Sequence, residues 1–71
     1  MSLQTKFIQT CIEAQVSCSV YLVNGIKLQG QIAAQDDQSI LLTSTTPNQL
    51  IFKHAVSTVV PSTKIEIDLE S

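Results

Sequence analysis

The sequence predicts a mainly β domain, with one N-terminal α-helix followed by five short antiparallel strands that bend into a small open barrel. Three observations predict this class. Apolar residues first repeat with helical spacing, then alternate with a period of two, and turn residues finally separate several short apolar runs. Every link between the predicted strands has the length of a hairpin connection, which favours antiparallel neighbours.

The predicted helix covers residues 2–14. Its apolar face recurs at spacings of four, four and three, and consists of Leu3, Phe7, Cys11 and Ala14. Ser2 is a suitable N-cap, because its hydroxyl oxygen can accept a hydrogen bond from a backbone N–H of the first turn. One short amphipathic helix therefore opens the chain.

The first two strands are predicted over residues 16–23 and 26–34. Apolar residues occupy alternate positions in both, so each strand has a buried and an exposed face. An Asn-Gly dipeptide supplies the turn. A three-residue loop over 24–26 keeps the two apolar faces together, and it makes Tyr21 and Gln29 direct cross-strand neighbours on the exposed face.

Three shorter strands are predicted over residues 39–45, 49–52 and 56–60. The breaks between and after them are Thr46-Pro47-Asn48, a bend at Lys53-His54-Ala55, and Pro61. The fourth and fifth strands are the candidate edges of the sheet, and such edges pair with another chain unless they are covered. A closed ring of identical subunits would satisfy both edges and enlarge the small core of a 71-residue chain.

The last ten residues, 62–71, alternate apolar and acidic side chains. This pattern is compatible with a sixth edge strand or with a frayed acidic tail, and both interpretations stay open. The predicted organisation is one domain over residues 1–61 followed by this short segment.

The composition excludes several classes of protein. No apolar run is long enough to span a bilayer, and the N-terminus lacks a signal-peptide pattern. With two free cysteines, Cys11 and Cys18, interpreted as small buried hydrophobic residues, we expect a cytoplasmic location. Two cysteines and one histidine do not form a zinc site, so we expect no metal or other cofactor. Four lysines, no arginine and a net charge of −2 weigh against a long electrostatic footprint on nucleic acid.

Catalytic candidates are few. His54 is the only imidazole, and Asp36-Asp37 is a pair of carboxylates without further oxygen donors nearby in sequence. We favour a histidine bonded to backbone at a strand bend and a solvated acidic turn over acid–base or metal chemistry. The sequence therefore predicts no enzymatic activity.

Tyr21, Lys27 and Gln29 are more suggestive as a binding surface. Tyrosine offers a ring on which a base can stack, glutamine offers an amide that reads a base edge, and lysine contacts phosphate. An ordinary solvent-facing sheet surface explains the same pattern equally well, and periodicity alone does not separate the two interpretations.

Two segments resemble the signature segments of the Hfq family, the bacterial members of the Sm-like proteins. They are Val20–Ile32, with the sequence VYLVNGIKLQGQI, and Phe52–Pro61, with the sequence FKHAVSTVVP. The similarity extends from Leu3 to Pro61. It implies an Sm-like fold for residues 1–61, a homohexameric ring, and a role as an RNA chaperone in post-transcriptional regulation with messenger RNA and small regulatory RNA.

The resemblance also implies two RNA-binding faces. The distal face, which binds adenine-rich RNA in the family, is matched by Tyr21, Gly25, Ile26, Lys27, Leu28, Gln29, Gln49 and Thr58. The proximal face, which takes uridine-rich RNA ends, is matched by Gln4, Lys53 and His54, with Gln38 at the position of the family's stacking aromatic residue.

Departures from the family pattern imply weakened proximal and rim sites. Gln38 offers no ring for stacking, and Asp37 replaces an amide with a charge that repels phosphate. Residues 12–15 lack the arginine cluster that many relatives carry on the rim. We therefore expect distal recognition of adenine-rich RNA with little rim-dependent annealing. The alternative, favoured by the acidic balance, is a structural or protein-interaction ring with reduced RNA binding.

Overall fold

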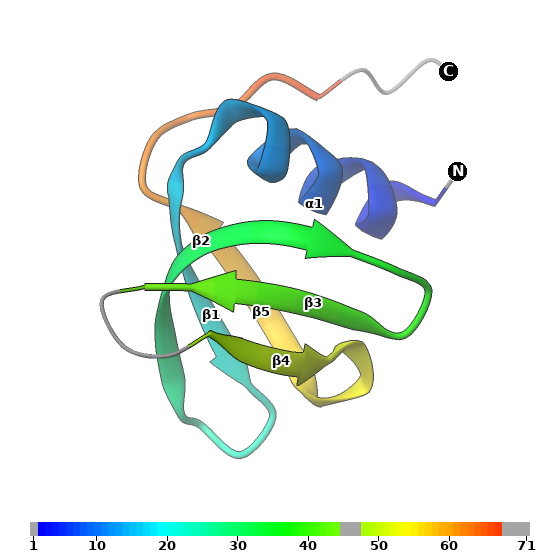
Figure 1. Cartoon of the computed structure of the whole chain (residues 1–71), viewed down its shortest axis with the longest axis vertical. Helices are drawn as coiled ribbons and strands as arrows, with labels where there is room; N and C mark the ends of the chain where they lie inside the picture. Colours follow the sequence, from blue (N-terminus) through cyan, green and yellow to red (C-terminus); the bar gives the residue numbers. More distant parts are fainter. Residues whose placement is uncertain (1, 45–47, 68–71) are drawn as a thin grey trace.

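The computed structural model describes residues 2–44 and 48–67, and in this part of the chain one helix precedes a single five-stranded sheet (Figure 1). The elements are α1 (Leu3–Ala14), β1 (Ser17–Leu22), β2 (Lys27–Gln35), β3 (Ser39–Thr43), β4 (Gln49–Phe52), the 3-10 helix η1 (Lys53–Ala55) and β5 (Val56–Pro61). All paired strands are antiparallel, in the order β4-β3-β2-β1-β5. The predicted fold class is confirmed, and β4 and β5 are the two edges, as predicted.

Helix α1 begins where the sequence predicts. The backbone N–H of Thr5 donates to Oγ of Ser2 over 3.1 Å, which confirms the N-cap. The predicted apolar face is correct only in its middle: Cys11 is buried and Phe7 is half-buried, whereas Leu3 is 63% exposed and Ala14 is exposed. Ile8, which lies beside this face, is buried. Helical periodicity identifies a face, but only the turns of that face that meet the sheet lose their contact with water.

The predicted register of the β1–β2 hairpin is wrong by two residues. Tyr21 pairs with Lys27, and Gln29 pairs with Ser19, so Tyr21 and Gln29 are not direct cross-strand neighbours. The loop is Val23 to Gly25, closed by a hydrogen bond from the Gly25 N–H to the Leu22 carbonyl oxygen over 2.9 Å. A loop of this kind ends in a residue with positive φ, and Gly25 adopts φ 93°. A loop over 24–26 would place a β-branched isoleucine there. The shift by two preserves both faces.

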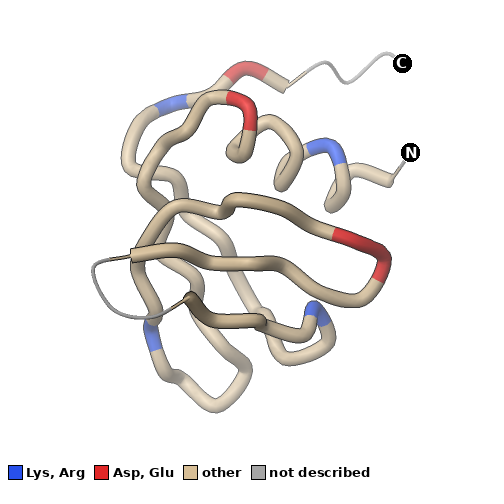
Figure 2. The backbone as a smooth tube through the Cα atoms, in the orientation of Figure 1, with Lys and Arg blue, Asp and Glu red and all other residues tan. Residues whose placement is uncertain are grey.

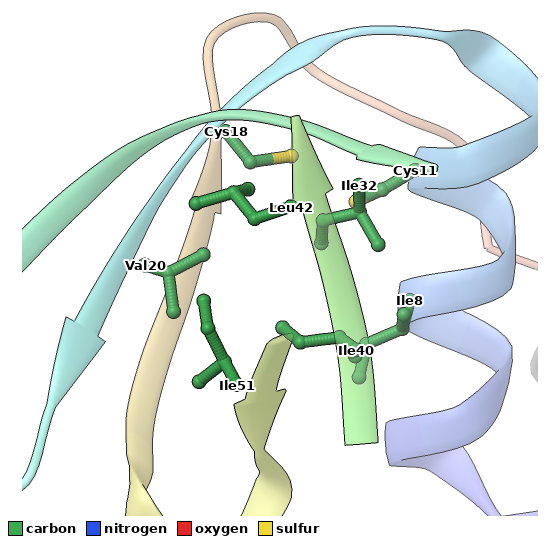
Figure 3. Packing of buried hydrophobic residues seen from close by; sticks show 8 residues of the cluster. All are labelled: Ile8, Cys11, Cys18, Val20, Ile32, Ile40, Leu42 and Ile51. Carbon is green, nitrogen blue, oxygen red and sulfur yellow. The ribbon is translucent and has the colours of Figure 1, made fainter. Parts of the chain in front are cut away.

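The core lies between α1 and the concave side of the bent sheet (Figure 3). It combines one helix face with inward positions of β1 to β4, and its buried members are Ile8, Cys11, Cys18, Val20, Ile32, Ile40, Leu42 and Ile51. Valines of β5 only pack against its margin. The two edge strands, β4 and β5, therefore contribute fewer buried side chains to the core than the central strands do.

The segment after β5 is not a strand in its described part, residues 62–67. The Ser62 N–H donates to the Ser17 carbonyl oxygen over 2.8 Å, and Ile65 packs against the core. The segment therefore continues along the body of the domain for several residues. The predicted apolar position Leu69, like the predicted break at Thr46-Pro47, lies outside the described residues.

The two cysteines are buried side by side in the core, and burial raises the pKa of both thiols, that of Cys18 from 9.0 to about 12. A raised pKa means that the folded chain holds the Cys18 proton more tightly than the unfolded chain does. The contribution of this thiol to the free energy of unfolding is therefore fully present below pH 9. Above pH 9 the free energy of unfolding is expected to fall, by at most about 1.4 kcal/mol per pH unit. Urea unfolding at pH 8, 9 and 10 measures this slope.

Cys18→Val is the matched control, because it removes the thiol from the same buried position. All other titrating groups remain in the variant. Its free energy of unfolding is expected to fall less steeply over this pH range than that of the parent chain. If the free energy of unfolding fell equally steeply with pH in both proteins, the pKa of the Cys18 thiol would not be raised in the folded state.

Candidate nucleic-acid interface

The predicted site residues gather at opposite ends of the strands. Because β2 and β3 are antiparallel, and β3 and β4 are antiparallel, the starts of β2 and β4 lie at one end of the sheet and their last residues at the other. Figure 1 shows the starts of β2 and β4 on the left, and the β2–β3 turn, η1 and the beginning of α1 on the right. At about 3.3 Å per residue, the ends of β2 are some 25 Å apart along the strand. With the exception of Thr58, the candidates of the two predicted faces therefore lie on separate surfaces.

Tyr21 is the centre of the first surface. It pairs with Lys27 of β2 on one side and with Thr58 of β5 on the other. Its side chain is 37% exposed, and the Lys27 Nζ lies 5.9 Å from the centroid of its ring, within the range of a cation–π contact. This arrangement leaves part of an aromatic ring open to solvent, with a cation beside it and a hydroxyl group on the neighbouring strand.

A shallow hollow of about 760 Å³ begins at Lys27, the residue of β2 that pairs with Tyr21. Lys27, Gln29 and Gln49 line it, together with Leu28, Gln31 and further residues of β1, β2 and β3. The fold thus brings Gln49 of β4 to the same hollow as the start of β2. The two glutamines present amide donors and acceptors, which suit recognition of a polar, planar ligand edge.

The remaining distal candidates lie in several different parts of the structure. Gly25 and Ile26 lie in and beside the hairpin turn, and both are exposed. Leu28 is half-buried and packs against the core as well as lining the hollow. Thr58 lines a different groove, the one between α1 and β5 that the proximal candidates Gln4 and Lys53 also line. The structure therefore unites Lys27, Leu28, Gln29 and Gln49 in one hollow and places Tyr21 and Thr58 beside it in the sheet.

The second surface surrounds Lys53 at the opposite end. Gln4 and Lys53 line one groove of about 450 Å³ between α1 and β5, whose other walls are mostly apolar. The Lys53 N–H donates to the Gln38 carbonyl oxygen over 2.7 Å, so these two predicted proximal residues are adjacent. His54 is exposed and stacks on Phe52, with ring centroids 5.9 Å apart and planes inclined by 16°.

Two residues of this surface are absent from the sequence prediction. Gln35 accepts a hydrogen bond from the Lys53 Nζ over 2.9 Å, and Phe52 provides the aromatic partner of His54. The alternation of Phe52 with a buried neighbour in a short edge strand was a usable signal for an exposed ring. No local signal connects Gln35 with a lysine eighteen positions later, because only the strand order brings the two together.

Charge is dispersed rather than gathered. Figure 2 shows the lysines scattered over the backbone and Asp36-Asp37 together at the β2–β3 turn, close to the second surface. Asp36 uses its carboxylate to accept hydrogen bonds from the N–H groups of Gln38 and Ser39, over 2.9 and 2.8 Å, which confirms a structural role in the turn. In residues 2–44 and 48–67, no three His, Cys, Asp or Glu residues form a potential metal site.

A model of the Hfq protein family matches residues 3–66 of the chain. The chain belongs to the Hfq family. A crystal structure at 1.55 Å of the pleiotropic translational regulator Hfq has the same fold, with a TM-score of 0.79 and 30% sequence identity. That similarity covers 83% of this chain and 98% of the other.

Membership in the Hfq family confirms the resemblance found in the sequence and establishes the general character of the molecule. Hfq proteins are Sm-like RNA-binding chaperones that form oligomeric rings and carry out no enzymatic reaction. Among the helices that the structure describes, none is long and apolar enough to cross a membrane.

Proposed function

We propose that this Hfq protein binds adenine-rich RNA on the surface around Tyr21, as a cytoplasmic homohexamer that acts in post-transcriptional regulation without a catalytic step. The observation that carries the proposal is the partly exposed Tyr21 ring between Lys27 and Thr58, beside a hollow lined by Gln29 and Gln49. A base stacks on the ring, and the two amides pair with the polar edges of adenines. Each subunit of a ring repeats this surface.

The two free edges of the sheet support the ring. On β4, Leu50 is 61% exposed and Phe52 is 52% exposed, which leaves two large apolar side chains on an unpaired edge strand. The opposite edge, β5, borders the apolar groove beneath α1. Pairing of β4 with β5 of the next copy satisfies both edges and covers the apolar surface. We propose the domain of residues 1–61 as the unit of this ring.

The Lys53 surface and the rim are proposed as weaker RNA sites. Gln38 provides no aromatic ring, and the carboxylates of Asp36 and Asp37 stand at the adjoining turn. The rim part of α1 contains Glu13 but no arginine. With six chains at −2 each, the formal charge of a hexamer is −12, so sequence-independent attraction to phosphate is small.

Fluorescence anisotropy with labelled oligo-A and oligo-U of equal length tests this function, after native mass spectrometry has established the mass of the ring. We expect tighter binding of oligo-A than of oligo-U. We also expect a shallow dependence of the oligo-A dissociation constant on salt, because stacking and base-edge contacts release few counterions.

Absence of oligo-A binding at low salt would contradict the proposed function. It would favour a ring that acts through protein partners with reduced RNA binding. A steep salt dependence with equal affinity for oligo-A and oligo-U would instead show that phosphate contacts dominate, and would contradict recognition of adenine around Tyr21.

A further inference from the structure

Gln35, at the end of β2, joins Lys53 to helix α1. Its Oε1 accepts a hydrogen bond from the Lys53 Nζ over 2.9 Å. Its Nε2 donates to the Thr5 carbonyl oxygen and to the Gln9 Oε1, each over 3.1 Å. All three bonds are partly buried. One amide therefore links the strand, the 3-10 helix and the first turns of α1.

Chemistry allows only one orientation of the Gln35 amide. The Thr5 carbonyl is purely an acceptor and the Lys53 ammonium purely a donor. A flipped amide would place oxygen against oxygen at α1 and nitrogen against nitrogen at Lys53. Both amide hydrogens are also used, since Nε2 has one partner for each. The helix therefore determines the direction in which Gln35 presents its oxygen to Lys53.

Hydrogen bonds also restrict the backbone near Gln35 and at Lys53. The Lys53 N–H donates to the Gln38 carbonyl oxygen over 2.7 Å, and the Asp36 carboxylate closes the turn that follows Gln35. The freedom that remains lies in the long side chain of Lys53. Its bond to Gln35 restricts that freedom before any ligand arrives.

We propose that Gln35 is a positioning residue, which holds the Lys53 ammonium group ready for the end of a uridine-rich RNA at the second surface. The inference rests on the proposed function of that surface. A flexible lysine must be ordered when it binds RNA, and a tethered lysine has already lost this freedom. Gln35 thereby compensates in part for the aromatic ring that Gln38 does not provide.

The test compares three variants of the assembled ring. Gln35→Met removes the acceptor with little change in side-chain length, and Gln35→Glu retains an acceptor for Lys53 but cannot donate to α1. Gln31→Met is the matched control, because Gln31 is another β2 glutamine that donates to an α1-side carbonyl, that of Gln15, over 3.0 Å. Each variant is measured by competitive acetylation of lysines with peptide mass spectrometry, and by oligo-U and oligo-A titration.

We expect Gln35→Met to raise the acetylation rate of Lys53 at least about threefold relative to that of Lys27, and to lower oligo-U affinity by about 3- to 10-fold. Oligo-A affinity is expected to stay unchanged. Gln35→Glu should keep Lys53 protected from acetylation yet weaken oligo-U binding, because its charge repels phosphate. Gln31→Met should change neither the acetylation rate of Lys53 nor the oligo-U affinity; its oligo-A affinity does not serve as a control, because Gln31 lines the hollow on β2.

Unchanged acetylation of Lys53 in Gln35→Met would overturn the proposal, and so would increased acetylation with unchanged or higher oligo-U affinity. If the parent ring binds no oligo-U, the proposed function of the second surface fails. The acetylation rates then decide separately whether Gln35 holds Lys53.

Discussion

Tyr21→Ala is expected to weaken binding of oligo-A by about 10- to 100-fold, because it removes the stacking surface between Lys27 and Thr58. Stacking of one base on an aromatic side chain contributes about 1–3 kcal/mol, and every subunit of the ring loses one such surface. Anisotropy titration of the intact variant ring measures the change. The oligo-U affinity reports on the opposite end of the sheet and is expected to remain the same.

Tyr21→Phe is the control for this prediction. It keeps the ring and removes only the hydroxyl group, so oligo-A affinity is expected to stay within about threefold of the parent if stacking is the main contribution. Native mass spectrometry of both variants checks assembly, which should persist because the Tyr21 side chain lies on the exposed face of the sheet. A fragmented ring, or full oligo-A affinity of Tyr21→Ala, would contradict the assignment.

Gly30→Ala is expected to destabilise the domain by about 3 kcal/mol or more. A Cβ atom at Gly30 would collide with the Thr43 carbonyl oxygen and lie 3.1 Å from the Ser44 Cβ, so it would press on the backbone of β3. Relief requires a shift of a strand rather than a side chain, which places the cost at the upper end of overpacking effects. Urea unfolding measures the change in the free energy of unfolding.

Gly25→Ala separates this close approach from the general cost of replacing a glycine. Nothing lies within 4 Å of a Cβ at Gly25, but its φ of 93° disfavours an L-residue. We expect a loss of about 1–2 kcal/mol from backbone strain alone. If Gly30→Ala lowered the free energy of unfolding no more than Gly25→Ala does, the close approach of β3 to Gly30 would not be the reason that a glycine is needed there.

The predicted elements agree with the structure where a local pattern controls burial. The Ser2 cap and the strand Gln49–Phe52 were predicted at the observed positions. The register of the first hairpin was wrong because two loops of equal length keep the same faces, and the alternation of side chains does not choose between them. The requirement for positive φ at the last loop residue, which only Gly25 meets without strain, makes that choice.

The residues of the candidate site likewise divide into those that a local pattern identifies and those that it does not. Tyr21 and Lys27 were recognisable because they occupy exposed positions of an alternating strand pair. Gln49 was assigned only through the family resemblance, and the order β4-β3-β2 explains how it reaches the hollow beside Gln29. Gln35 had no signal at all, since its partners Lys53 and Thr5 belong to distant parts of the chain.

The sequence by itself determined the mainly β class, the order of the elements, their inner and outer faces and the family, because periodicity, turn residues and the two signature segments are local properties of the chain. Only the tertiary structure decided which residues share the hollow next to Lys27 and that Gln35 is bonded to Lys53. These features depend on the strand order and on the close approach of β2 to β3 at Gly30, which bring together residues that no local pattern relates.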